Sequence, residues 1–384
     1  MTGLLRGVAA AVAVLAAISG PAFADGDAPY RMVRTLQALQ DGIAAGDPNA
    51  QTAQQEQIAA IGRAFAAAGD GAWDDPRNGR AAVVHVLSGG RPDPLRSLIR
   101  HEDYGLDPAL VRGALAFAEG RSEEAKAAFA TLDPRTLPQS LGGQVALVHG
   151  LLSIGADSAE ANRLLDLARL LMPGTLVEEA ALRRQAMLAA DVRDYTRFAA
   201  LSERYFRRFG RSLYAGGFLR QFAAAAAGFE FDALAAGPAP LAKLLSEMEP
   251  DTRRAAALAI ARAALVAGSV KVASLAAEQA STISAAGTRE GASGTLYQAA
   301  VLLLTDAEGA ERRLQGMDDR LLPQADRALR GAALSLSRRI MEWPVGEDAG
   351  RIPEATNAEG VDTALLARGR AVLAAADALL ARPR

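Results

Sequence analysis

The sequence predicts an all-α fold built from stacked helical hairpins. Half of the 384 residues are hydrophobic but only 5% are aromatic, so Ala and Leu, both strong helix formers, must build the core. Apolar residues recur at helical spacing, as in Met32, Leu36, Leu39 and Ile43, which share one helix face. Gly46 breaks this helix, and a second helix is expected over residues 51–68.

The same unit of helix, turn and second helix recurs along the chain. From Gly90 onward the turns are spaced by 30 to 41 residues, close to the period of helix-pair repeats. Residues 109–134 form the clearest unit, with small residues where the helices meet, and this unit resembles a tetratricopeptide repeat. We therefore predict a tetratricopeptide-like repeat solenoid, with an irregular helical bundle as the alternative. The predicted hairpin turns are at Gly46, Gly90, Gly120, Gly155, Asp191, Gly228, Gly268 and Gly309.

Local signals at the helix starts support this register. Residues 157–160 (DSAE) and 175–178 (TLVE) are capping boxes, in which the first side chain and the Glu each satisfy a free backbone N–H. Residues 81–87 (AAVVHVL) are the one β-like run. Because hairpins flank it, we expect a helix there and keep a strand as the alternative.

The first 24 residues have the order of a secretory signal peptide. A basic start ending at Arg6 is followed by an apolar run over residues 7–18, and residues 22–24 (AFA) supply the small-x-small cleavage pattern. The apolar run is shorter than the roughly 20 residues of a membrane helix. We expect cleavage after Ala24 and export to the periplasm, with no membrane insertion after cleavage.

Composition divides the remaining chain into four segments. We expect N-terminal helical hairpins over residues 25–105 and a helical repeat array over residues 106–341. Residues 342–360 are acidic and rich in Gly and Pro, which is typical of a linker. Residues 361–384 return to an Ala- and Leu-rich helical pattern and are expected to cap the array.

Residues for catalysis or metal binding are scarce. The chain has no cysteine, and its three histidines, His85, His101 and His149, are not at metal-chelating spacing. We expect His85 and His149 to be hydrogen-bonded core residues and His101 to be a solvated helix end. The net charge of −2 argues against nucleic-acid binding. We therefore expect no catalytic residue, no cofactor and no metal.

Arginine pairs with nearby aromatic residues are the strongest candidates for a binding surface. The pairs 183–184 and 207–208 lie on either side of the Asp191 turn, and we expect them to belong to consecutive hairpins. A third pair is formed by Arg338 and Arg339. One interpretation is charge complementing helix ends and the i,i+4 pair of Glu179 with Arg183. The other is a basic and aromatic surface for an acidic protein partner. The predicted partner-binding residues are Arg183, Arg184, Tyr205, Arg207, Arg208 and Tyr214.

Three stretches resemble the MotC family of periplasmic motility proteins. They are residues 29–41 (PYRMVRTLQALQD), residues 173–184 (PGTLVEEAALRR) and residues 205–215 around YFRRF and SLYA. The resemblance extends from residue 29 to about residue 220. It implies a non-enzymatic protein required for flagellar rotation, which binds the periplasmic part of the stator protein MotB as a chaperone or assembly factor.

Two other functions remain open on the sequence alone. Lytic transglycosylases also carry long helical superhelices, but they need a catalytic domain with an acidic glutamate, and only about 25 residues follow the predicted linker. A generic repeat scaffold for another envelope complex is the second alternative.

Overall fold

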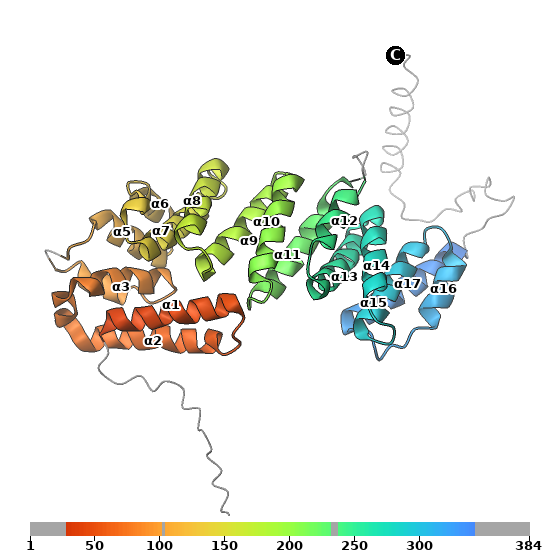
Figure 1. The fold of residues 1–384 in the computed structure, drawn as a ribbon, viewed down its shortest axis with the longest axis horizontal. Helices are drawn as coiled ribbons and strands as arrows, with labels where there is room; N and C mark the ends of the chain where they lie inside the picture. Colours follow the sequence, from red (N-terminus) through yellow and green to blue (C-terminus); the bar gives the residue numbers. More distant parts are fainter. Residues whose placement is uncertain (1–27, 102–103, 232–236, 342–384) are drawn as a thin grey trace, which may run out of the picture.

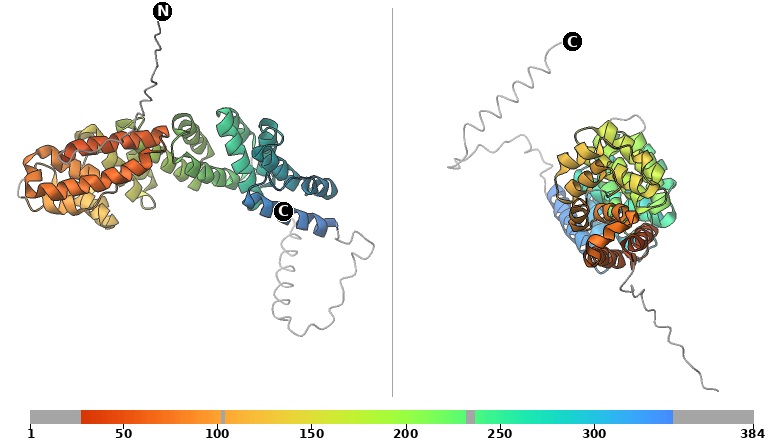
Figure 2. Two further views of the ribbon diagram at one scale, coloured as in Figure 1. Left: turned by 90° about the horizontal axis from the view of Figure 1, so that it is seen from below. Right: turned by 90° about the vertical axis from the view of Figure 1, so that its left-hand side faces the viewer.

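The computed structural model describes residues 28–101, 104–231 and 237–341. In these ranges the chain forms seventeen α-helices, two short 3₁₀-helices and no strand, so the predicted all-α array is confirmed. The helices stack side by side into an elongated body (Figures 1 and 2). The tetratricopeptide-like detail stays a prediction. The predicted signal peptide, the linker and the C-terminal helix lie outside the described residues.

The α-helices are α1 (Pro29–Ala45), α2 (Ala50–Ala68), α3 (Pro76–Leu87), α4 (Asp93–Leu98), α5 (Pro108–Ala118), α6 (Ser122–Phe129), α7 (Gln139–Ser153), α8 (Ser158–Leu171), α9 (Leu176–Asp191), α10 (Tyr195–Phe209), α11 (Ala215–Gly228), α12 (Ala239–Ser246), α13 (Pro250–Ala267), α14 (Val270–Ile283), α15 (Arg289–Leu302), α16 (Ala307–Gln315) and α17 (Gln324–Met341). The 3₁₀-helices are η1 (Gly69–Asp74) and η2 (Pro134–Thr136).

Most helices pair with their sequence neighbour, as the predicted turns require. The turn at Gly46 joins α1 to α2, and the turns at Gly120, Gly155 and Gly268 likewise join packed helices. Two predictions need correction. Gly228 ends α11, but α11 packs on α13 rather than on α12. Gly309 lies inside the first turn of α16, because Asp306 caps that helix and the chain has already turned before it.

Side-chain caps form at both helix starts where capping boxes were predicted, although neither capping box is complete. Asp157 accepts a hydrogen bond from the Glu160 backbone N–H at 2.9 Å, but the Glu160 carboxylate pairs with Arg163 instead of returning to Asp157. Thr175 accepts from the Val177 N–H at 3.2 Å. The β-like run over residues 81–87 belongs to α3, as expected.

The core consists of three adjoining apolar clusters. The first runs from Met32 to Val148, so it includes residues on both sides of the segment boundary that we predicted at residue 105. A second, smaller cluster joins α7, α8 and α9. The largest spans α9 to α17 and also takes in Ala44 from the end of α1. Small residues allow close helix contacts, since a Cβ on Gly113 of α5 would collide with the Phe129 ring of α6.

The end of the first hairpin docks onto the middle of the array. The Leu213 backbone N–H, between α10 and α11, donates to the Ile43 carbonyl at 3.3 Å. Gly46 has a positive φ of 94° and lies against the Arg211 backbone, so that any Cβ there would meet the Arg211 carbonyl oxygen. The chain therefore fastens its N-terminal helices to the α10–α11 turn, far away in the sequence.

Two histidines are buried without the hydrogen bonds that the sequence analysis expected. His85 on α3 is 1% exposed, and neither of its ring nitrogens has a partner in the described part of the chain. Burial lowers the pKa of His85 to about 4. His149 on α7 is also buried, and its Nδ1 is unpaired. The expectation of hydrogen-bonded histidines was wrong because the rings pack beside aromatic residues, His85 beside Phe65 and His149 beside Phe129.

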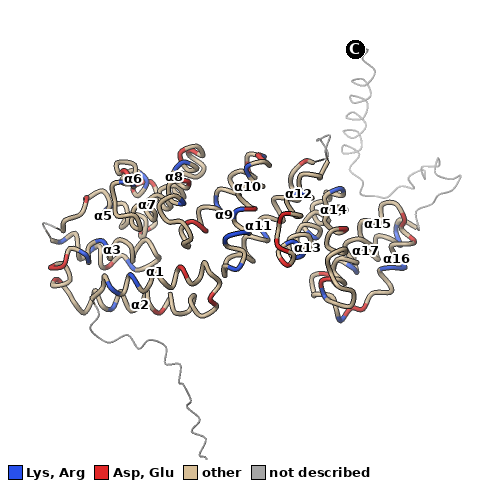
Figure 3. The backbone as a smooth tube through the Cα atoms, viewed as in Figure 1, with Lys and Arg blue, Asp and Glu red and all other residues tan. Residues whose placement is uncertain are grey.

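Charged residues are distributed along the whole array. Acidic and basic residues are interspersed along the backbone from α1 to α17 (Figure 3). Among the residues that the structure describes, no helix combines the length and hydropathy needed to cross a bilayer.

Substituting Gly46 tests the docking of the first hairpin. We expect Gly46→Ala to lower the unfolding free energy by about 3 kcal/mol, because it adds a backbone clash to the cost of positive φ. Gly155→Ala is the matched control: its φ is 89° and its surroundings are open, so it costs about 1 kcal/mol. Urea denaturation measures both, and equal losses would contradict the docking.

His85 makes stability fall in mild acid. Above pH 6.5 its imidazole is neutral in folded and unfolded chains alike. Between pH 6.5 and about 4 only the unfolded chain gains the proton, so the unfolding free energy falls by up to about 3 kcal/mol. His85→Leu removes this contribution. Denaturation from pH 7 to pH 4 should show a shallower decline for the variant, and parallel curves would refute this account.

Candidate partner-binding site

The predicted arginines lie on a single hairpin. Helices α9 and α10 pack on one another and are joined by a short turn after Asp191, with Asp194 capping α10. The prediction that the two arginine pairs occupy consecutive hairpins was therefore wrong, since the Asp191 turn is the turn within one hairpin. Arginines from both helices converge on two carboxylates of α9.

Glu178 is the first of these carboxylates, and its side chain is 1% exposed. It accepts a hydrogen bond from the Gly174 backbone N–H at 2.6 Å, just before α9 begins. Arg208 of α10 pairs with it at 2.9 Å, and Arg204 lies 3.8 Å away. Glu178 thus joins the start of α9 to the last turns of α10.

Glu179 is fully buried beside it. Its Oε1 accepts from the Tyr205 hydroxyl at 2.7 Å and from the Ser212 hydroxyl at 3.0 Å. The Nε of Arg183 lies 3.6 Å from the same oxygen, which confirms the predicted i,i+4 pair. The Arg183 guanidinium also lies 5.0 Å from the centre of the Tyr214 ring. Burial and the adjacent Glu179 raise the pKa of Tyr205, so its hydroxyl acts as a donor.

The six predicted residues therefore divide by exposure. Tyr205 is 0% exposed, so our expectation that it belongs to an exposed basic and aromatic surface was wrong. Arg183 and Tyr214 are half-buried against each other, and Arg208 is tied to Glu178. Arg184 and Arg207 are exposed, and within the described ranges Arg207 has one ion pair, with Glu203 at 2.8 Å. Sequence periodicity did not reveal this division, because it depends on two buried acids.

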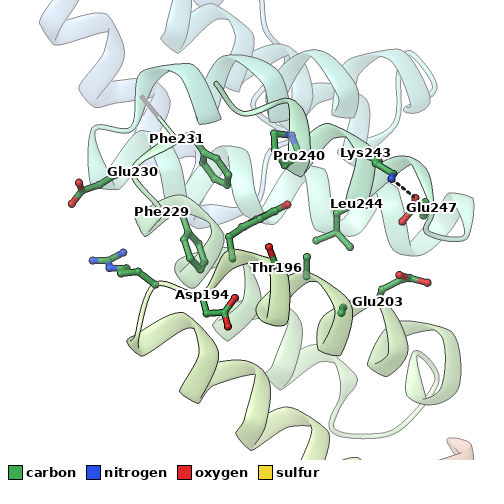
Figure 4. A pocket seen from close by; sticks show the side chains of 14 residues that line it. Asp194, Thr196, Glu203, Phe229, Glu230, Phe231, Pro240, Lys243, Leu244 and Glu247 are labelled. Atoms are coloured by element: carbon green, nitrogen blue, oxygen red, sulfur yellow. Dashed lines mark ion pairs between the residues drawn. The ribbon is translucent and has the colours of Figure 1, made fainter. Parts of the chain in front are cut away.

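A groove that was not predicted from the sequence lies along the face of α10 that points away from Glu178 and Glu179. It has a volume of about 790 Å³ and lies between α10, α12 and residues 229–231 (Figure 4). Its apolar wall includes Tyr195, Phe229, Phe231 and Leu244, and the Tyr195 ring packs edge-on against both phenylalanines. The only sequence signal was the cluster of aromatic residues at 229–231, which is distant from Tyr195 in the chain.

Polar groups around the groove are unevenly satisfied. The Tyr195 hydroxyl is buried and has no hydrogen-bond partner among the described residues. Burial, and to a lesser extent the charge of Glu247, raise the pKa of Tyr195, so this hydroxyl stays protonated. A buried donor without a partner costs free energy, which an incoming acceptor recovers.

The described residues hold no group of three or more His, Asp or Glu side chains placed to bind a metal ion. The candidate site consists of one groove with an apolar wall, several ion pairs and exposed arginines. Such features bind other molecules by shape and charge.

Comparison with known proteins identifies the family. The family model described as "Chemotaxis protein MotC" matches residues 1–383. The chain belongs to the MotC family. The Chemotaxis protein MotC of Rhizobium meliloti (strain 1021) is 32% identical over 328 residues, which cover 85% of this chain and 75% of that relative. No solved structure matches the chain. The resemblance noted over residues 29–220 is confirmed and extends over the remaining chain.

Arg207 and Arg208 are adjacent in the sequence of this MotC family member, but we expect only Arg208 to contribute to stability. We expect Arg208→Ala to lower the unfolding free energy by about 2 kcal/mol, because it leaves the buried Glu178 short of its closest cation. Arg207→Ala removes only an exposed pair and should cost less than about 0.5 kcal/mol. Thermal and urea denaturation of the two variants measures the difference, and equal stabilities would show that Glu178 does not need Arg208.

Proposed function

We propose that this protein acts in flagellar motility as a non-enzymatic periplasmic protein that binds the periplasmic part of the stator protein MotB. In this role it serves as a chaperone or assembly factor. The observation that carries the proposal is the match to the MotC family over residues 1–383.

Three further observations support the proposal. The N-terminal residues have the order of a secretory signal, which supports export to the compartment of the proposed partner. The helical hairpins stack into an extended array, an architecture that offers long surfaces for protein binding. The described surface carries exposed arginines and a groove with an aromatic wall, and both features are common in protein-binding surfaces.

Arg184 and Arg207 are the members of the predicted set that a partner reaches without disturbing the core. Both are exposed on the α9–α10 hairpin, where Arg208 and Tyr214 are partly accessible as well. Arginine side chains contribute strongly to protein interfaces because each guanidinium makes several directed hydrogen bonds. We propose that these two arginines contact acidic groups of the partner.

Removing both arginines tests the function. In a strain that lacks the gene, a plasmid carrying Arg184→Ala/Arg207→Ala should fail to restore swimming in soft agar. The purified variant should bind the periplasmic domain of MotB about tenfold or more weakly, equivalent to at least 1.4 kcal/mol. Its melting temperature should stay near that of the wild type, because neither arginine supports a buried group.

Arg63→Ala/Arg80→Ala is the matched control, since both residues are exposed arginines on α2 and α3. It should swim and bind normally. If the wild-type protein fails to bind the MotB domain, the proposed partner is wrong. If the Arg184/Arg207 variant swims and binds like the control, the proposed contact residues are wrong.

A further inference from the structure

We propose that the groove between α10 and α12 binds a short extended peptide segment that carries an apolar side chain flanked by basic residues. This inference rests on the proposed function only for the identity of the protein that supplies the segment, which is MotB. The groove adjoins Arg207, whose ion-pair partner Glu203 lines it, but none of the six predicted partner-binding residues is part of the lining.

The shape of the groove fits an extended peptide. Along α10 its lining runs from Tyr195 to Glu203, and along α12 it begins at Pro240 and ends at Glu247, just past the helix. At 1.5 Å per helical residue, the α10 wall is about 12 Å long. An extended chain covers this length with about four residues. A segment of that size places one apolar side chain against the aromatic wall described above.

The charge around the groove selects the flanking residues. Four carboxylates and two cations line it. Both cations are engaged: Arg193 donates to the Gly228 carbonyl, and Lys243 lies 4.0 Å from Glu247. Glu230 is exposed, and no partner for it is found in the described ranges. Glu203 is paired with Arg207, a cation just outside the lining, so the groove and its immediate surroundings carry an excess of one negative charge, which attracts Lys or Arg on the ligand and repels acidic segments.

The buried Tyr195 hydroxyl supplies the third argument. Tyr195 lines the groove, and its buried hydroxyl lacks a hydrogen-bond partner within the described structure. A peptide brings backbone carbonyl oxygens, which are strong acceptors. The free protein bears the cost of the unpaired donor, and the bound peptide relieves it. Recognition therefore combines apolar contact, acidic flanks and one directed hydrogen bond.

The first experiment measures binding of two fluorescent peptides to the full exported chain. The probe is Lys-Leu-Trp-Leu-Lys and its counterpart is Glu-Leu-Trp-Leu-Glu, both with blocked ends. Anisotropy titration should show the basic peptide binding at least tenfold more tightly than the acidic one. Absence of binding by the basic peptide, or equal binding of the two, would overturn the proposal.

Variants locate this binding in the groove. Ala200→Phe places a large side chain in the groove from an exposed helix position and should abolish binding. Ala127→Phe is its matched control on α6, also exposed, and should bind normally. Asp194→Asn/Glu230→Gln should weaken the basic peptide about tenfold and reduce the preference over the acidic one. Asn at position 194 keeps the cap of α10.

Tyr195→Phe has opposite effects on stability and binding. The melting temperature should stay equal to that of the wild type or rise, because a buried unpaired hydroxyl is removed. Peptide affinity should fall several-fold, because the directed hydrogen bond is lost. Unchanged affinity in this variant would contradict the role given to the hydroxyl, and unchanged affinity in Ala200→Phe would contradict the site.

A parallel pull-down of the MotB periplasmic domain keeps the two proposals separate. If wild type and Ala200→Phe capture it equally, the groove does not bind MotB and MotB is wrong as the source of the segment, while the proposed function stands. If the wild type captures none of it, the proposed function fails, and the peptide titrations alone decide the groove.

Discussion

Burial of two adjacent carboxylates in α9 is the constraint on which the middle of the array depends. Glu178 and Glu179 are almost completely removed from water, and buried carboxylates are stable only with hydrogen-bonding and cationic partners. Those partners come from the loop before α9, from α10 and from the α10–α11 turn. The same turn receives the end of α1 through Ile43 and Gly46. The contacts of these two acids thus connect the N-terminal helices to the array, and Glu179 makes its hydrogen bonds through Oε1 alone, since its Oε2 has no hydrogen-bond partner among the described residues.

The arrangement recurs near the end of the described chain. Asp326 of α17 is 3% exposed and accepts hydrogen bonds from Ser293 and Tyr297 of α15, with Arg262 of α13 at 3.3 Å. In both places a buried acid gathers a serine, a tyrosine and an arginine. An Ala-rich core has few large side chains to specify how helices pack. These polar clusters supply directional contacts that apolar packing of small residues lacks.

Local signals in the sequence predicted much of the fold, whereas long-range contacts stayed hidden. The helix over residues 51–68 and the helical state of residues 81–87 follow from periodicity and from turn residues. The turn predicted at Gly309 was wrong because glycine also occurs within helices. Asp306, a capping residue, was the stronger signal for the start of the helix. The burial of Tyr205 was missed because an aromatic beside arginines looks the same in sequence whether it faces solvent or a buried acid. The groove was missed because α10, residues 229–231 and α12 form it together only after folding.

A double-mutant cycle between Glu179 and Tyr205 tests the central claim most directly. Urea denaturation would give the unfolding free energies of the wild type, Glu179→Gln, Tyr205→Phe and the double variant. If the buried carboxylate depends on its partners, the two single changes are strongly non-additive, with a coupling energy of about 1–3 kcal/mol. Additivity to within about 0.5 kcal/mol would show that the buried acid does not organise the hairpin and would contradict the account.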